Sequence, residues 1–200
     1  AQAGKPSAGY PNSDLREEFA KAEKSDDKPN SGYGEKNGSG EGVALGRYQL
    51  RKPILKAAGW QDADGNWTAK AKEAGVESDA EFLRNPQAQE QAMSDVMAAI
   101  ERQADVKPPN RKFSLSEFIG EEFVGKEGGI KITEAGLYGA IHRQGETAVR
   151  DYFAKYRALG NQSPVVKRGI GGITPDSAIE PRLRELQGVP YKRITPPKPG

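Results

Sequence analysis

The chain has no cysteine and a single histidine among its 200 residues. The absence of cysteine excludes disulfides, cysteine-ligated zinc and thiol catalysis, and it makes the chain compatible with oxidising and reducing compartments alike. One histidine also excludes a histidine-rich metal site. No G-x-S-x-G sequence is present, which argues against a Ser-His-Asp triad of the hydrolase type.

Long apolar runs and an excess of one charge are missing as well. No segment approaches the roughly 20 apolar residues that a membrane-spanning helix needs. The chain has 30 basic and 28 acidic side chains, which gives a net charge of +2. A charge so close to zero gives no support for nucleic-acid binding. With 35% hydrophobic residues, 24 glycines and 14 prolines, we expect a soluble domain with substantial loops.

The apolar residues that are present recur mostly at helical spacing. In the first such segment, Leu15, Phe19 and Ala22 mark one face. The same reasoning predicts helices over 13–24, 53–58, from 86 onward, 133–143 and 146–159. Residues 113–132 fit either a helix and loop or a hairpin. The pattern therefore predicts a mostly α (α+β) fold with a glycine-rich loop or small β-hairpin.

The domain organisation is predicted from composition. Residues 1–12 are typical of a disordered lead-in. Residues 13–160 form one domain in this interpretation. Residues 161–200 are rich in Pro and Gly and are predicted to be an extension with one short helix in SAIEPRLRELQ.

A glycine-rich segment, SGYGEKNGSGEGVALGRYQL, follows the first predicted helix. Six glycines fall within it: Gly32, Gly34, Gly38, Gly40, Gly42 and Gly46. Glycine allows the backbone to pass close to another molecule. The polar cluster Arg47-Tyr48-Gln49 at its end is a candidate binding element.

Glu23 is the candidate general acid. On a helix it lies about 40° from Phe19, at the edge of the apolar face, and it stands where the chain enters the glycine-rich segment. A carboxyl partly shielded from water suits acid catalysis. The alternative is an ordinary solvated glutamate, since Glu18 flanks the other edge of the same face. His142 is likewise either functional or a helix-terminal histidine that bonds a carbonyl.

Four motifs in order resemble the lysozyme-like superfamily of peptidoglycan-cleaving enzymes. They are AEKS, which contains Glu23, then GRYQ, GNWTAKAKEAGVESDAEFLRNPQAQEQAM and AGLYGAIHRQGETAVRDYF. The phage and bacterial muramidase and lytic transglycosylase branches are the most similar. The resemblance covers about residues 13–160.

The resemblance implies a lysozyme-like helical fold that cleaves the β-1,4 bond between N-acetylmuramic acid and N-acetylglucosamine. Glu23 would be the general acid. Tyr48 and Gln49 would position the sugar and its N-acetyl group. Arg47 would either meet substrate carboxylates or pin the loop by a salt bridge, and His142 would line the cleft near Glu23. The resemblance implies no metal and no organic cofactor.

The sequence does not identify a second catalytic carboxylate to act with Glu23. Glu23 is followed by KSDDKPN, where the family commonly has Ser or Gly. Glu35 and Glu41 have the best loop positions for a partner carboxylate, and Asp26 and Asp27 are other choices. Hydrolysis needs such a partner, whereas lytic transglycosylases manage with one acid/base, so both reactions remain possible.

The alternative function is a non-catalytic peptidoglycan-binding or assembly protein with the same fold. Residues 161–200 would then dock to an envelope, secretion-system or virion partner. Peptidoglycan glycan strands are the expected partner in either case, with no nucleic acid and no membrane span. The opening AQAGKPSAGYPN is compatible with a mature exported N-terminus, so we expect a periplasmic, envelope or secreted location.

Overall fold

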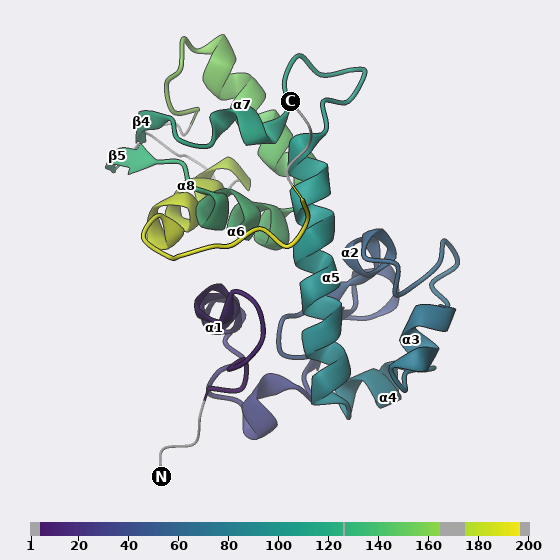
Figure 1. Cartoon of the computed structure of the whole chain (residues 1–200). Coiled ribbons are helices and arrows are strands. Elements are labelled where there is room, and N and C mark those ends of the chain that lie inside the picture. Colours follow the sequence, from purple (N-terminus) through teal and green to yellow (C-terminus); the bar gives the residue numbers. More distant parts are fainter. Residues whose placement is uncertain (1–4, 126, 165–174, 197–200) are drawn as a thin grey trace. The chain divides into compact units, whose positions relative to one another are not determined.

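The computed structural model describes residues 5–125, 127–164 and 175–196. This part of the chain is mostly helical, with helices α1 to α8 (Figure 1). It also contains two small antiparallel sheets. The predicted fold class, mostly α with a small β element, is confirmed. No helix within the described residues is both long enough and apolar enough to cross a membrane.

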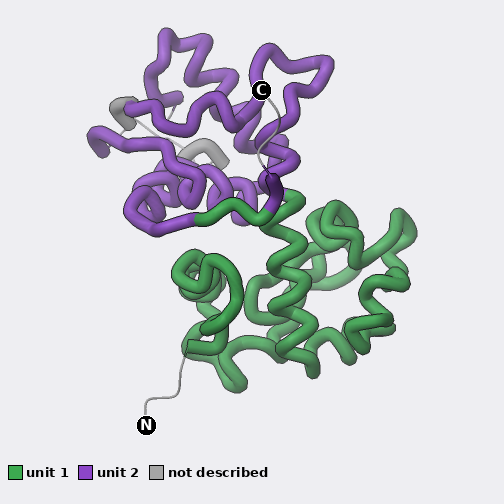
Figure 2. Tube along the Cα trace, in the orientation of Figure 1, with its two compact units in different colours: residues 1–99, 192–194 green, residues 100–191, 195–200 purple. Residues whose placement is uncertain are grey.

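The chain divides into two compact units (Figure 2). Unit 1 runs to Ala99 and includes 192–194, and unit 2 holds 100–191 and the chain from Thr195. The boundary falls inside the 20-residue helix α5 (Pro86–Asp105). The sequence predicted a single domain over 13–160. Helical periodicity continues unbroken through the boundary, so the sequence pattern does not reveal it.

Unit 1 begins with α1 (Ser13–Ala22) and a three-stranded sheet. Its strands are β1 (Lys36–Asn37), β2 (Ala44–Leu45) and β3 (Leu50–Arg51), in the order β1-β2-β3. Leu45 is the Cα partner of Lys36 on one side and of Leu50 on the other. The glycine-rich segment therefore carries this sheet. Helices α2 (Lys52–Ala57), α3 (Ala69–Glu73), α4 (Asp79–Leu83) and the first part of α5 complete the unit.

The core of unit 1 combines residues of two apolar faces that the sequence predicted with an aromatic cluster that it did not. Leu15 and Phe19 of α1 are fully buried. An aromatic cluster forms around Phe82, whose ring centroid lies 6.2 Å from that of Trp60 and 5.1 Å from that of Trp67. On α5, the predicted apolar residues Ala92, Met93, Val96 and Met97 are buried in unit 1, and Ile100, the last of the stripe, is buried in unit 2.

Unit 2 is assembled from a hairpin and three helices. Residues 113–132 contain a 3-10 helix (Leu115–Phe118) followed by the antiparallel hairpin β4 (Glu122–Gly125) and β5 (Gly128–Lys131). The helices are α6 (Glu134–Gln144), α7 (Glu146–Ala158) and α8 (Pro175–Leu186). Phe118 stacks on Phe153 of α7 with ring centroids 4.3 Å apart.

The described part of the predicted extension, 161–200, is integral to the units. Ile179, Leu183 and Leu186 of α8 are fully buried, because the helix packs against α6. Gly136 of α6 permits this close approach, since a Cβ there would lie 3.1 Å from the Leu183 carbonyl oxygen. The apolar face of α8 is thus occupied within unit 2 and does not offer a docking surface.

Residues after α8 are also held by specific bonds. In unit 2, the Tyr191 hydroxyl and the Thr195 backbone N–H both donate to the buried carboxylate of Glu101. In unit 1, the Asn12 side chain exchanges two hydrogen bonds with the backbone of Lys192, at 2.9 and 2.7 Å. These bonds explain why the Pro- and Gly-rich composition did not produce a separate extension here.

Candidate functional site

Glu23 is the C-cap of α1 and is partly buried. The helix ends in a Schellman-type turn, in which the Ser25 N–H donates to the Ala20 carbonyl and the Lys24 N–H donates to the Lys21 carbonyl. Lys24 occupies the left-handed position of this turn, with φ of 56°, where glycine is usual. Glu23 is therefore held at a tightly closed helix end.

The chain returns to this helix end a few residues later. Gly32, at φ of 82°, lies so close to Ser25 that a Cβ at position 32 would be 2.5 Å from the Ser25 Cβ. The start of the glycine-rich segment thus packs against the turn that follows Glu23. This contact brings the segment to the helix end that carries Glu23, and the role of Glu23 as general acid stays a prediction.

Backbone strain is concentrated between Glu23 and Gln49. Six non-glycine residues in the described chain have φ in the left-handed region, and four of them are Lys24, Asn30, Ser31 and Gln49. Each costs on the order of 1–3 kcal/mol, and such residues gather at functional sites. The strain here has to be compensated by the packing around it.

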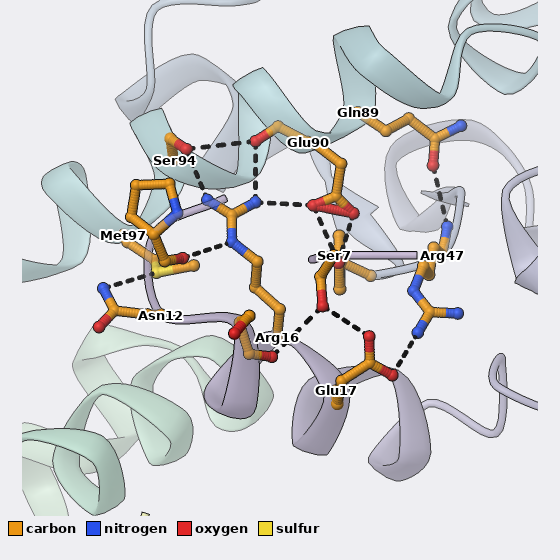
Figure 3. Close-up of polar contacts among 12 residues, drawn as sticks. Ser7, Asn12, Arg16, Glu17, Arg47, Gln89, Glu90, Ser94 and Met97 are labelled. Carbon is orange, nitrogen blue, oxygen red and sulfur yellow. Dashed lines mark hydrogen bonds and ion pairs between the residues drawn. The ribbon is translucent and has the colours of Figure 1, made fainter. Parts of the chain in front are cut away.

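Arg47 joins the glycine-rich segment to α1 (Figure 3). Its guanidinium donates to the Glu17 carboxylate at 2.8 Å and to the Ser31 carbonyl at 2.6 Å. The guanidinium carbon lies 5.7 Å from the Tyr33 ring centroid and 5.8 Å from that of Tyr48, within cation–π range. Arg47 is 1% exposed. Arg47 was predicted either to contact substrate carboxylates or to hold the loop through a salt bridge. The structure contains the salt bridge, to Glu17.

Tyr48 points inward to a buried carboxylate on α5. Its hydroxyl donates to Glu90 at 2.5 Å, and the Tyr33 hydroxyl donates to the same carboxylate at 2.9 Å. Tyr48 is 1% exposed. Its side chain therefore holds the loop against α5 in this structure, and the predicted sugar contact would require it to leave Glu90.

Arg16 of α1 balances the charge of Glu90 (Figure 3). Its guanidinium is fully buried and donates to the Glu90 carboxylate at 2.7 Å, to the Glu90 carbonyl at 2.9 Å and to the Ser94 hydroxyl at 2.5 Å. With Arg47 and Glu17, the network contains two cations and two carboxylates. It is neutral overall, which is what makes its burial tolerable.

Gln89, the neighbour of Glu90, holds the loop through its side-chain amide. The amide oxygen accepts the Arg47 backbone N–H at 3.0 Å, and the amide nitrogen donates to the carbonyls of Tyr33 and Phe82 at 2.8 Å each. Gly46 makes room for it, because a Cβ there would lie 2.2 Å from the Gln89 amide oxygen. Consecutive residues of α5 therefore bind both ends of the segment 33–48.

The tyrosine hydroxyls of this network are protected from ionisation. Burial raises the pKa of Tyr33 and of Tyr48 far above the ordinary value, and the negative charge of Glu90 and the hydrogen bond to it raise each pKa further. Both hydroxyls therefore remain hydrogen-bond donors to Glu90 throughout the physiological range.

Gln49, Glu35 and Glu41 are predicted site residues of the glycine-rich segment that stay accessible, unlike Arg47 and Tyr48. Gln49 is partly buried, with its side chain bonded to the Gly46 carbonyl at 2.9 Å and to Asn37 at 2.8 Å. Glu35 is partly buried, and its carbonyl accepts the Gly46 N–H at 2.7 Å. The Glu41 side chain is 92% exposed and pairs with Lys52 at 3.1 Å. The backbone of Glu35 is thus tied to Gly46, and its side chain is less exposed than that of Glu41.

His142 lies in the last turn of α6, in unit 2, whereas Glu23 lies in unit 1. The predicted approach of His142 to Glu23 stays a prediction. Across residues 5–125, 127–164 and 175–196, no three His, Asp or Glu side chains form a group that could hold a metal ion.

Sequence reasoning missed the α5 residues that organise the site. Gln89 and Glu90 lie in NPQAQEQAM and are 1% exposed each, as is Arg47. A signal was present, since Gln89 and Glu90 lie three positions before Ala92 and Met93, respectively, on the helix face predicted to be core. A buried carboxylate at such a position calls for a buried cation, which Arg16 supplies.

Comparisons of the chain with protein-family models, with curated proteins and with solved structures give no match.

The contact between Gly46 and Gln89 gives a first prediction. Gly46→Ala introduces a left-handed alanine and displaces the Gln89 amide, whereas Gly40→Ala introduces only the backbone strain, because no atom lies within 4 Å of its Cβ position. We expect Gly46→Ala to lower the free energy of unfolding by about 1–3 kcal/mol more than Gly40→Ala does. Urea unfolding of both variants measures this difference. Equal losses would contradict the assigned role of Gln89.

The raised tyrosine pKa values give a second prediction, at alkaline pH. Tyr33 and Tyr48 stay protonated in the folded state at a pH where they ionise in the unfolded state. Their stabilising contribution is complete below about pH 10 and is lost as the pH rises above it, by about 1.4 kcal/mol per tyrosine over the first unit. Urea unfolding between about pH 8.5 and 11 should show this loss.

The double variant Tyr33→Phe/Tyr48→Phe is the control for the alkaline loss. It lacks both hydroxyls, so its free energy of unfolding should fall less steeply with pH than that of the wild type. Tyr156 and Tyr191, whose pKa values are also raised by burial, contribute equally to both proteins. Identical slopes in the two proteins would show that Tyr33 and Tyr48 are not protected.

Proposed function

We propose that the chain is a peptidoglycan-cleaving glycosidase that acts on the β-1,4 bond between N-acetylmuramic acid and N-acetylglucosamine. The observation that carries the proposal is the packing of Gly32 against Ser25, which keeps the glycine-rich segment beside the helix end that bears Glu23. The lysozyme-like resemblance requires this neighbourhood of acid and loop. The setting that fits this activity is the periplasm, the envelope or the extracellular space.

Glu23 is the general acid in this proposal. It would protonate the glycosidic oxygen and later act as a base. Its place at the end of α1 supports the role, because the turn at Lys24 and Ser25 fixes the backbone on which the carboxyl is carried. A fixed carboxyl can be positioned within hydrogen-bond reach of the leaving oxygen.

The glycine-rich segment provides the substrate contacts in this proposal. Arg47 and Tyr48 act indirectly, by holding the segment to Glu17 and Glu90. Gln49 is the side chain that would contact the N-acetyl group, and its strained φ of 49° supports a functional reason for keeping a glutamine there. Glu35 is the partner carboxylate if the reaction is hydrolysis.

The test of this proposal compares Glu23→Gln with Glu18→Gln. Glu18 flanks the same apolar face of α1 and forms only a surface pair with Lys21 at 3.3 Å. Clearing of a purified peptidoglycan suspension should slow by about 10²- to 10⁴-fold in Glu23→Gln, the usual contribution of a general acid, and should be unchanged in Glu18→Gln.

Two results would overturn the assignment in different ways. Equal clearing by wild type and Glu23→Gln would mean that another group is the acid. A wild-type protein that sediments with peptidoglycan but never clears it would favour the non-catalytic binding function. Circular dichroism of Glu23→Gln checks that any loss of activity is not a loss of fold.

A further inference from the structure

Unit 1 contains a cavity of about 400 Å³ between α3, α5 and the N-terminal segment. Lys70 and Glu73 of α3, Gln91, Ser94 and Asp95 of α5, and Tyr10 line it. Its volume falls in the range of about 300–1,000 Å³ that small-molecule sites occupy. None of the predicted site residues lines this cavity, so it is a separate feature of the unit.

The wall of the cavity is fixed by the side chain of Asp95. One carboxylate oxygen, Oδ2, accepts the Trp60 indole N–H at 2.7 Å and forms an ion pair with the Lys70 ammonium at 3.1 Å. Trp60 is 1% exposed, so the bond anchors Asp95 to the core. The Asp95 side chain is itself 33% exposed. Its other oxygen, Oδ1, has no bonding partner among the described residues and remains as an acceptor.

Tyr10 adds an aromatic ring to the cavity. The Arg16 guanidinium carbon lies 5.4 Å from its ring centroid, which ties the ring to the buried network of α1 and α5. Ser94 is tied to the same network, because its hydroxyl accepts from Arg16 and donates to the Glu90 carbonyl. These two lining residues are therefore pre-organised by bonds outside the cavity.

The chemistry of the lining favours a neutral ligand with many hydroxyl groups. Glu73 and Asp95 are acceptors, Lys70 is a donor and the Gln91 amide is both, and a sugar hydroxyl can donate and accept in the same way. The two carboxylates disfavour an anion, and the pairing of Lys70 with Asp95 leaves the lining to bind a ligand mainly through hydrogen bonds. An aromatic ring such as that of Tyr10 offers an apolar face beside the polar groups, which suits a pyranose ring.

We propose that this cavity binds a short neutral saccharide, at a site separate from Glu23 and the glycine-rich segment. Such a site would hold a second stretch of glycan while the proposed cleavage site works on the first. The binding step itself does not depend on cleavage, so it can be tested in a protein that has lost the general acid.

The two tryptophans of the chain provide the measurement. The Trp60 indole N–H bonds Asp95 at the cavity, whereas the Trp67 indole N–H bonds Asp79. In nitrogen-15 NMR spectra of the full-length Glu23→Gln protein, added N-acetylglucosamine trisaccharide should shift the Trp60 indole signal in a saturable way. The Trp67 indole signal is the internal reference and should move little.

A pair of exposed glutamines on α5 supplies the matched variants. Gln91 lines the cavity and Gln87, one turn earlier, does not. Gln91→Ala should weaken trisaccharide binding about fivefold, the effect of one lost hydrogen bond, whereas Gln87→Ala should bind as before. Both positions are on the surface, so both variants are expected to fold.

Three outcomes would overturn the saccharide site. The first is a Trp60 indole signal that does not move when the Glu23→Gln protein is saturated with trisaccharide. This outcome counts against the site even if the sugar binds elsewhere and the wild-type protein cleaves peptidoglycan. The second is equal binding by Gln91→Ala and Gln87→Ala. The third is a Trp60 shift produced by a diamine such as cadaverine and not by the trisaccharide, which would assign the cavity to amines. A wild-type protein that shows the Trp60 shift with the trisaccharide but does not clear peptidoglycan would overturn the proposed function alone.

Discussion

The candidate site depends on one buried ion pair, between Arg16 of α1 and Glu90 of α5. Both side chains are nearly inaccessible, so each charge is tolerable only because the other is present, and removal of one partner of such a pair typically costs about 3–5 kcal/mol. Glu90 also accepts from Tyr33 and Tyr48. One carboxylate thus joins α1, α5 and the glycine-rich segment.

The bonds to Glu90 explain how a segment whose glycine content favours many backbone conformations is held in one conformation in the structure. Left-handed backbone at Lys24, Asn30, Ser31 and Gln49 is unfavourable, and six glycines add conformational entropy to the unfolded chain. The hydrogen bonds of Gln89 and Glu90 offset these costs by holding both ends of the segment. A segment held in this way can present Gln49 and Glu35 in one arrangement, which is the pre-organisation that a binding site needs.

Much of the fold was predictable because periodicity reports directly on which face is buried. The helices at 13–24, 86–105, 133–143 and 146–159 were recognisable for this reason. The boundary after Ala99 was not, since an unbroken helix carries the chain across it. The short helix in SAIEPRLRELQ was recognisable and corresponds to α8. The burial of its Ile179, Leu183 and Leu186 in unit 2 was not predicted, because the Pro and Gly content outweighed this short apolar repeat.

The candidate site residues could be chosen from the sequence, whereas the orientation of their side chains could not, and their roles stay predictions. Glu23 and the glycine-rich segment were identified by their order along the chain, and the structure keeps them together in unit 1. The inward orientation of Arg47 and Tyr48 could not be predicted, because it depends on partners 42 or more positions away on α5 and on Glu17 of α1. Polar side chains after a flexible loop suggest a ligand, and here their partner is the protein itself.

The most direct test of the account is mass spectrometry of the fragments that the wild-type protein releases from purified peptidoglycan. The account predicts muropeptides that all end in N-acetylmuramic acid, with reducing ends if Glu35 or another carboxylate supports hydrolysis and 1,6-anhydro ends if the protein is a transglycosylase. Fragments that end in N-acetylglucosamine, fragments cut only in their peptides, or no released fragments at all would contradict it.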